Sequence, residues 1–199
     1  MLAPALLAFV LGATISCVEL ITTKYPRTSF LLSRSRSLYL YALLYGLIAA
    51  GLMFGLNSLT AKGIVKLEGL GLDSAWTRAV IVGLGVKAFM HVNFVSVTVG
   101  KDVQPIGVET LTKLFEPTLL RNIDYDEWTG IDTFLQPRVT KYSDLAAVKN
   151  IAKASIPGAI PNAEREGFGI DVDHAATVRA VLELFLRFAG QKPFNHVFP

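Results

Sequence analysis

Long apolar segments dominate the first half of the chain, whereas the second half alternates apolar and charged positions. Three segments, residues 2–22, 38–56 and 76–97, are each almost free of charge. A helix rises about 1.5 Å per residue, so about 20 residues cover the roughly 30 Å hydrocarbon layer of a bilayer. The pattern therefore predicts three transmembrane helices over these residues.

Residues 98–199 show the periodicity of amphipathic helices instead. Helices are predicted over residues 105–116, after which Pro117 breaks or restarts the helix, from Ser143 to before Pro157, and over residues 174–189. Asp173 is expected to cap the last helix and Gly190 to end it. The predicted fold class is an all-α membrane protein with three transmembrane helices followed by a small α-rich domain, joined by a short linker near residue 98.

The distribution of charge supports this division. The chain is 52% hydrophobic, and residues 1–97 carry 8 basic and 3 acidic residues against 11 and 13 in residues 98–199. We expect a transmembrane domain at 1–97 and a water-soluble domain at 98–199. The sequence pI near 9.0 arises largely from lysines and arginines beside the spans, so direct nucleic-acid binding is not expected.

The basic residues also predict an orientation. The loop from Lys24 to Arg36 contains four positive charges and no acid, which marks it as cytoplasmic. Three spans then place the N-terminus outside and residues 98–199 in the cytoplasm of a cell with the protein in its inner membrane. The lone Cys17 excludes an intramolecular disulfide and fits a reducing compartment.

Small residues spaced by four occur in every predicted span. Such spacing lets helix backbones approach closely inside a bilayer. Two interpretations remain open: the small residues pack the three helices of one chain together, or they form a face for self-association. The predicted helix-packing positions are Gly12, Gly46, Gly51, Gly55 and Gly83.

Ionisable residues inside the predicted spans require partners, because a charge in hydrocarbon costs a few kcal/mol. Glu19 lies near the cytoplasmic end of the first span, and Lys87 and His91 share one face of the third. We expect an interhelical ion pair, in which Glu19 meets His91 and Lys87 lies one turn deeper. The alternatives are a water-filled pore or proton path and snorkelling of the side chains to the headgroups.

The region 122–132 is the most acidic part of the chain. Its spacing lacks the glycine and the distal glutamate of a helix–loop–helix calcium site, so Asp124 is expected to cap a helix rather than bind metal. Other candidates for chemistry are Asp171, Asp173, His174 and His196, which no second motif supports. The sequence thus predicts no catalytic, cofactor or metal site.

The segment 174–189 is apolar around most of its circumference, with one stripe of charge. Its three charges argue against a fourth span. A surface helix needs only a narrow apolar face, so this helix is expected to be buried on several sides, in the domain core and in a subunit interface. Burial in the core alone and docking on the membrane are the alternatives. The predicted interface residues are Val181, Leu182, Phe185 and Phe188.

These features predict a non-enzymatic, oligomeric membrane component whose cytoplasmic domain binds partners. The partners expected are membrane lipid, further copies of the chain and other protein subunits. An effector that permeabilises the membrane as a pore, or a sensor of a bacterial defence or stress system, fits this architecture. A structural subunit of a large membrane complex is the first alternative, and a membrane-bound enzyme is the second.

Overall fold

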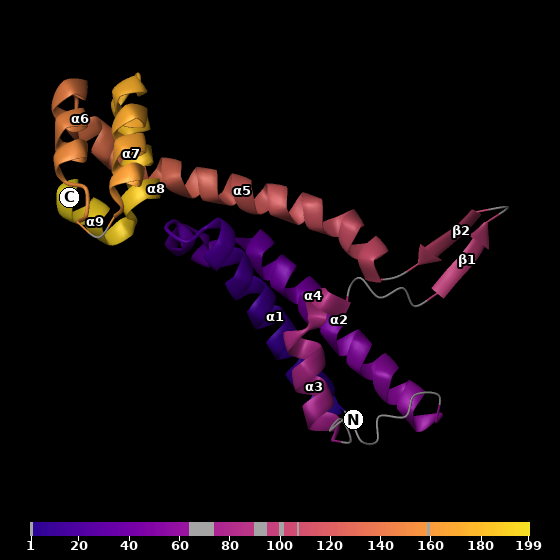
Figure 1. The fold of residues 1–199 in the computed structure, drawn as a ribbon. Helices are drawn as coiled ribbons and strands as arrows, with labels where there is room; N and C mark the ends of the chain where they lie inside the picture. The colour runs from indigo at the N-terminus through magenta and orange to yellow at the C-terminus, as the bar shows by residue number, and fades with distance from the viewer. Residues whose placement is uncertain (1, 64–73, 90–94, 100–101, 107, 159) are drawn as a thin grey trace. The chain divides into compact units, whose positions relative to one another are not determined.

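The computed structural model describes residues 2–63, 74–89, 95–99, 102–106, 108–158 and 160–199. Most of these residues are helical (Figure 1). The chain divides into two compact units. Unit 1 comprises Met1–Lys24 and Arg36–Ile123, and unit 2 comprises Tyr25–Ser35 and Asp124–Pro199. The predicted boundary at Thr98 stays a prediction, while the contacts divide the chain after Lys24, Ser35 and Ile123.

Two long helices, α1 (Leu2–Lys24) and α2 (Arg36–Ala61), form an antiparallel hairpin in unit 1 (Figure 1). Small residues line the inner side of α1 at helical spacing: Ala5, Ala8, Gly12 and Ser16. A Cβ on Gly12 would lie 2.7 Å from the Cβ of Ala49 on α2. The two backbones therefore approach more closely than larger side chains would permit.

The third predicted span is wrong as one continuous helix. The segment 76–97 breaks into α3 (Ala75–Leu84), α4 (Val86–Phe89) and a strand, β1 (Val95–Val99). Gly85 ends α3, because a residue without a side chain is a poor helix former. Thus two helices of the described chain, α1 and α2, are long and apolar enough to cross a membrane.

Helices α3 and α4 nevertheless pack along α1 and run in the same direction. A Cβ on Gly83 would lie 2.6 Å from the Cβ of Leu11, and one on Gly12 would lie 3.7 Å from Val86. Ser74 caps α3 by accepting a hydrogen bond from the backbone N–H of Trp76. In unit 1, α1, α2 and α3 therefore form a bundle in which α3 is the shortest helix.

An antiparallel hairpin replaces the predicted linker after residue 98. Strand β1 pairs with β2 (Asp102–Ile106), and Val97 lies opposite Gln104. Alternating valines at 95, 97 and 99 suit a strand better than a helix, because β-branched side chains pack well on a pleated surface.

Helix α5 (Val108–Lys141) is much longer than expected, and it passes through both Pro117 and Pro137. The prediction that Pro117 breaks or restarts the helix is wrong. Buried residues recur at every fourth position after it: Ile123, Glu127, Ile131 and Leu135. This packing stabilises the helix and offsets the hydrogen bond that a proline removes.

Unit 2 combines the second part of α5 with four helices, α6 (Leu145–Ala154), α7 (Asn162–His174), α8 (Val178–Ala189) and α9 (Gln191–Val197). The loop Tyr25–Ser35, which we call the strap, belongs to the same unit and contains a short 3₁₀ helix, η1 (Ser29–Arg34). Large apolar residues fill the core: Leu135, Val148, Phe168, Leu182, Phe185, Phe194 and Phe198.

The helix boundaries in unit 2 follow local signals in part. Asp144 caps α6, as expected for a helix that begins at Ser143-Asp-Leu, and Gly190 ends α8 with a φ of 83°. The N-cap of α8 is Thr177, however, and not Asp173, which lies near the end of α7. The sequence Ala175-Ala-Thr ends one helix and starts the next, which the apolar pattern does not reveal.

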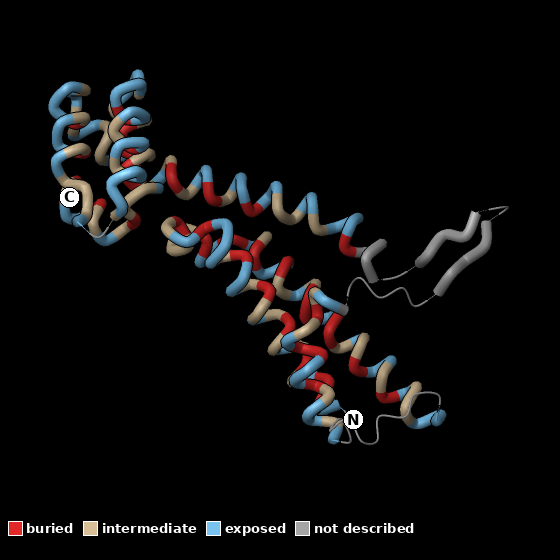
Figure 2. The backbone as a smooth tube through the Cα atoms, viewed as in Figure 1, coloured by how far each residue is buried: buried red, intermediate tan, exposed pale blue. Residues whose placement is uncertain are grey.

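Buried positions recur along the helices of both units (Figure 2), but the residue types at these positions differ. Unit 2 places its large apolar residues inside, as water-soluble domains do. In unit 1, α1 turns small residues inward and exposes larger ones at Leu2, Leu6, Val10 and Val18. Helix α2 exposes Leu40, Leu43, Leu47 and Phe54.

Candidate functional site

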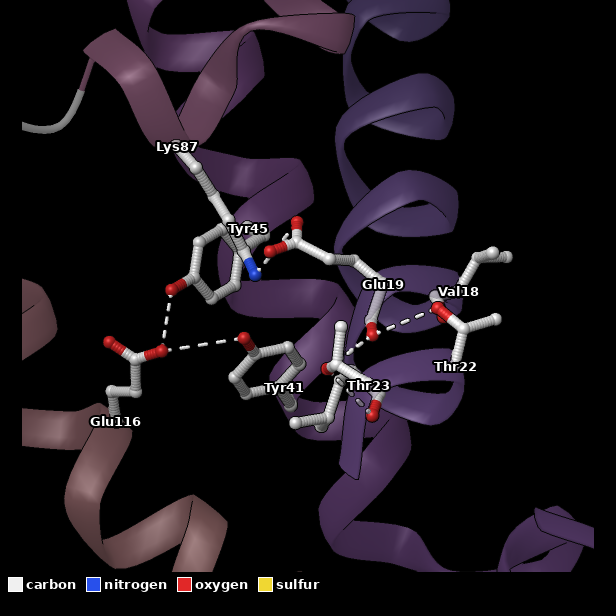
Figure 3. A network of polar contacts seen from close by, with 9 residues as sticks. Val18, Glu19, Thr22, Thr23, Tyr41, Tyr45, Lys87 and Glu116 are labelled. Carbon is white, nitrogen blue, oxygen red and sulfur yellow. Dashed lines mark hydrogen bonds and ion pairs between the residues drawn. The ribbon is translucent and has the colours of Figure 1, made fainter. Parts of the chain in front are cut away.

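A cluster of polar side chains joins the helices of unit 1 (Figure 3). The Lys87 ammonium lies 3.0 Å from a carboxylate oxygen of Glu19, which ties α4 to α1. It also lies 5.5 Å from the centre of the Tyr45 ring, a distance at which the ring face attracts a cation. The sequence prediction named both Glu19 and Lys87, and the structure brings them together. The predicted partner His91 lies outside the described residues.

Two tyrosines of α2 complete the cluster by binding a carboxylate of α5. The Tyr45 hydroxyl donates to Oε1 of Glu116 over 2.7 Å, and the Tyr41 hydroxyl is 3.3 Å from the same oxygen (Figure 3). Both tyrosines are buried, and their rings lie 4.8 Å apart. The sequence alone does not reveal Glu116, because it lies far from α2 along the chain and only the tertiary fold brings the two together.

The contacts of this cluster join α1 to α4 and α2 to α5. Each of its charged or hydroxyl groups is engaged by another group of the same chain. Thr22 and Thr23 of α1 likewise donate to the carbonyls of Val18 and Glu19, so their hydroxyls are satisfied within the helix. Polar side chains that find partners in this way are compatible with apolar surroundings.

The five predicted glycine positions separate into two groups. Gly12, Gly46 and Gly83 lie inside unit 1, where an added Cβ would come within 3 Å of a neighbouring atom. A Cβ added to Gly51 or Gly55 would meet no described atom within 4 Å outside its own helix. Close packing within one chain thus accounts for the first three, and the last two form an open stretch on α2.

The acidic residues at the start of the unit 2 part of α5 hold the strap. The Tyr25 hydroxyl donates to Asp124, and the Ser35 hydroxyl donates to Asp126 over 2.6 Å. Burial and the neighbouring Asp124 raise the pKa of Tyr25 well above its ordinary value. The expectation that Asp124 caps a helix is wrong, because α5 runs continuously through this position.

Glu127 is the most deeply buried acid of this set. Its Oε1 accepts a hydrogen bond from the Thr28 hydroxyl at 2.5 Å and one from Nη1 of Arg187 at 3.0 Å. Arg187 also reaches Glu183 one turn earlier on α8. The strap, α5 and α8 are therefore joined through one carboxylate, which periodicity arguments cannot identify.

Apolar contacts reinforce these polar ones. Leu31 of the strap lies so near α5 that a Cβ on Gly130 would approach it to 3.1 Å, and the Phe30 ring meets Phe134 edge to face at 5.3 Å. Leu32 is fully buried. The strap is consequently an integral part of the core of unit 2.

The predicted interface residues lie in unit 2 as well. Val181, Leu182 and Phe185 are fully buried in its core, and Phe188 stacks on Phe168 with ring centres 4.3 Å apart. Burial in the domain core therefore holds for these three side chains, and a role of this helix in a subunit interface stays a prediction.

The remaining candidates for chemistry do not assemble. Lys153 forms an ion pair with Asp173 that lowers the pKa of this exposed carboxyl, and Lys149 donates to the Asp173 carbonyl. His174 ends α7, and His196 lies in α9. Within the described part of the chain, no group of three or more His, Cys, Asp or Glu residues is placed to hold a metal ion.

The fold and this site define a predominantly helical protein with two helices of membrane-spanning length and a water-soluble type of core in its second unit. No known protein family, curated protein or solved structure matches the chain.

Proposed function

We propose that the protein is a multi-pass integral membrane component whose second unit, in water on one side, binds other proteins. The observation that carries the proposal is the inverted packing of unit 1. Most residues that α1 buries are small, whereas Leu2, Leu6, Val10 and Val18 are exposed. Exposed apolar surface of this extent is unfavourable in water but not in lipid, where helices associate through close packing of small residues.

The exposure of the two long helices supports the same conclusion. The most apolar 18-residue windows of α1 and α2 are only 28% and 39% buried. A core helix of a soluble protein is apolar because it is covered, and these helices are largely uncovered. The packing of Gly12 against Ala49 also fits a helix retained in the protein better than a leader that is removed.

Polar contacts occur near both ends of the hairpin. Tyr41 and Tyr45 mark one end of α2, and Asn57, which accepts a hydrogen bond from Arg78 at 2.9 Å, marks the other. From Tyr41 to Asn57 the helix rises by about 24 Å. This is close to the thickness of a hydrocarbon layer, so the two polar levels suit the two boundaries of a bilayer.

The strap supports a cytoplasmic location for unit 2. It connects α1 to α2 and belongs to unit 2, so both must face the same aqueous compartment. Lys24, Arg27, Arg34 and Arg36 lie in or beside it, and loops with this excess of positive charge stay in the cytoplasm. The short α3 and α4, which run along α1, return the chain toward this side.

We propose further that copies of the chain associate through α2. Gly51 and Gly55 are exposed, and their spacing of four permits close approach of a second helix. The polar cluster, in contrast, is engaged within the chain, which favours an interaction component over a pore-forming effector.

Two measurements on the full chain test the proposal. Membranes that contain the protein are extracted with alkaline carbonate and floated on a density gradient, and the detergent-solubilised protein is weighed by native mass spectrometry. We expect the protein to stay with the floated membrane and to form an oligomer that Gly51→Leu disrupts. Release by carbonate would contradict membrane insertion.

The mass measurement and a measurement of ionic conductance across the vesicle membrane separate the alternatives. A structural subunit of a larger complex would be monomeric until its neighbours are added. A pore-forming effector would give the vesicles an ionic conductance that Lys87→Met alters. We expect intact vesicles without such conductance.

A further inference from the structure

Tyr125 and Trp128 form an exposed aromatic pair on α5 in unit 2. They are 64% and 50% exposed, and their ring centres lie 6.1 Å apart. The phenylalanines of the core, such as Phe185 and Phe194, are by contrast fully buried. Exposure of neighbouring large aromatic side chains to water is unfavourable, so we expect this pair to contact another surface.

Arg179 of α8 supplies a positive charge to this pair. Its guanidinium carbon lies 5.9 Å from the centre of the Trp128 ring, and its Nη2 is 2.9 Å from a carboxylate oxygen of Asp132. A guanidinium has five N–H donors, and its pairing with Asp132 leaves others to bind an oxyanion. The side chain is 40% exposed, so these donors are accessible.

The strap connects the part of α5 that contains this pair to the last residue of α1. Tyr25 directly follows Lys24, the last residue of α1, and its hydroxyl donates to Asp124, the residue before Tyr125. Trp128 is about one helical turn, or roughly 5–6 Å, further along α5. If α1 crosses a bilayer, the start of the strap lies at the membrane surface, and Tyr125 and Trp128 lie near it.

We infer that Tyr125, Trp128 and Arg179 form an interfacial anchor that enters the headgroup layer of the bilayer. This inference rests on the proposed membrane insertion. Tyrosine and tryptophan favour this layer because their rings are apolar and their O–H or N–H groups reach water and lipid oxygens. Arg179 binds lipid phosphate, and the basic residues of the strap attract anionic lipids to the same surface.

The anchor gives unit 2 a fixed orientation at the membrane. The chain joins this unit to unit 1 after Lys24, after Ser35 and after Ile123, and the aromatic pair adds a point of attachment to the lipid. A signal or partner that binds unit 2 would then act on a unit attached to the lipid surface.

Quenching of tryptophan fluorescence by brominated lipids tests the anchor. The chain contains two tryptophans, so Trp76→Phe leaves Trp128 as the single reporter. The full chain is reconstituted in vesicles of phosphatidylcholine and phosphatidylglycerol, with bromine near the headgroup end of the acyl chains or near their middle. We expect blue-shifted emission from Trp128 and stronger quenching by the shallow bromines.

The matched control is Trp128→Phe, which leaves Trp76 at the start of α3. If the vesicles carry the protein through flotation and quench Trp76 but not Trp128, the anchor is refuted and membrane insertion stands. Stronger quenching of Trp128 by deep bromines also refutes it. Blue-shifted Trp128 emission without quenching refutes it too, because the ring is then covered by protein and not by lipid. If the protein does not float, membrane insertion fails and the anchor with it.

Discussion

Gly12 on α1 lies against Ala49 on α2 with no room for a side chain, since an added Cβ would be 2.7 Å from the Cβ of Ala49 and 3.2 Å from the carbonyl oxygen of Tyr45. Gly12→Ala should therefore push the helices apart. Overpacking of this kind costs about 1–3 kcal/mol. We expect that loss in the free energy of unfolding, measured in mixed micelles with a denaturing detergent.

Gly167→Ala is the matched control, because it adds the same methyl group to an exposed position of α7. It should leave the stability unchanged or raise it by up to about 1 kcal/mol, as alanine favours a helix over glycine. Equal losses for the two variants would show that Gly12 does not form this contact.

The buried Glu127 should contribute more to unit 2 than the partly exposed Glu183, although both bind Arg187. Glu127→Gln removes the charge that Thr28 and Arg187 share, and hydrogen bonds to a charged group contribute about 1.5–3 kcal/mol. Glu183→Gln removes only a pair one turn apart, worth about 0.3–0.5 kcal/mol. Chemical denaturation followed by near-UV circular dichroism measures both, and a larger effect for Glu183 would contradict the strap contacts.

Alkaline pH should loosen the strap through Tyr25. Its pKa is raised in the folded protein by burial and by Asp124, so folding favours the protonated phenol. The stabilisation is complete below the ordinary tyrosine pKa of about 10 and is lost as the pH rises beyond it. Tyr25→Phe should unfold with a shallower pH dependence in this range. An unchanged dependence in a thermal-unfolding series would exclude the Tyr25–Asp124 contact as its source.

The ion pair between Glu19 and Lys87 should contribute only modestly, since both side chains are partly exposed. A double-mutant cycle with Glu19→Gln and Lys87→Met is expected to give a coupling of about 0.5–1 kcal/mol. Tyr45→Phe should cost more than either variant alone, because it withdraws a buried donor from Glu116. Zero coupling in the cycle would mean that the two residues do not interact.

Periodicity and composition predict the helical character of the chain, the two long apolar helices, the start of α6 and the C-terminal end of α8. These elements depend on local signals: apolar length, the Asp144 cap and the glycine at 190. The prediction of a third span is wrong because the mean hydropathy of a segment does not reveal a break within it. Here Gly85 ends α3, and the valines after residue 94 form a strand. The assignment to a defence or stress system stays a prediction that rests on architecture.

The polar contacts were only partly predictable. A charged residue in an apolar helix requires a partner, and for that reason the sequence predicts that Glu19 and Lys87 form polar contacts. The partners of Asp124, Asp126 and Glu127 lie about 90 to 100 residues earlier in the strap or 60 residues later in α8. No local pattern encodes such pairings, so an acidic run that holds the strap was interpreted as a helix cap.

The solvent around the outer faces of α1 and α2 is the central question, and spin-label accessibility answers it most directly. In a Cys17→Ala background, nitroxides are placed at Leu6, Val10 and Leu47, with Ala8 as the buried control and Asp144 as the aqueous one. In vesicles, we expect the three outer positions to collide more with oxygen than with a water-soluble nickel complex. Preferential collision with the nickel complex at these positions would contradict a membrane-spanning hairpin.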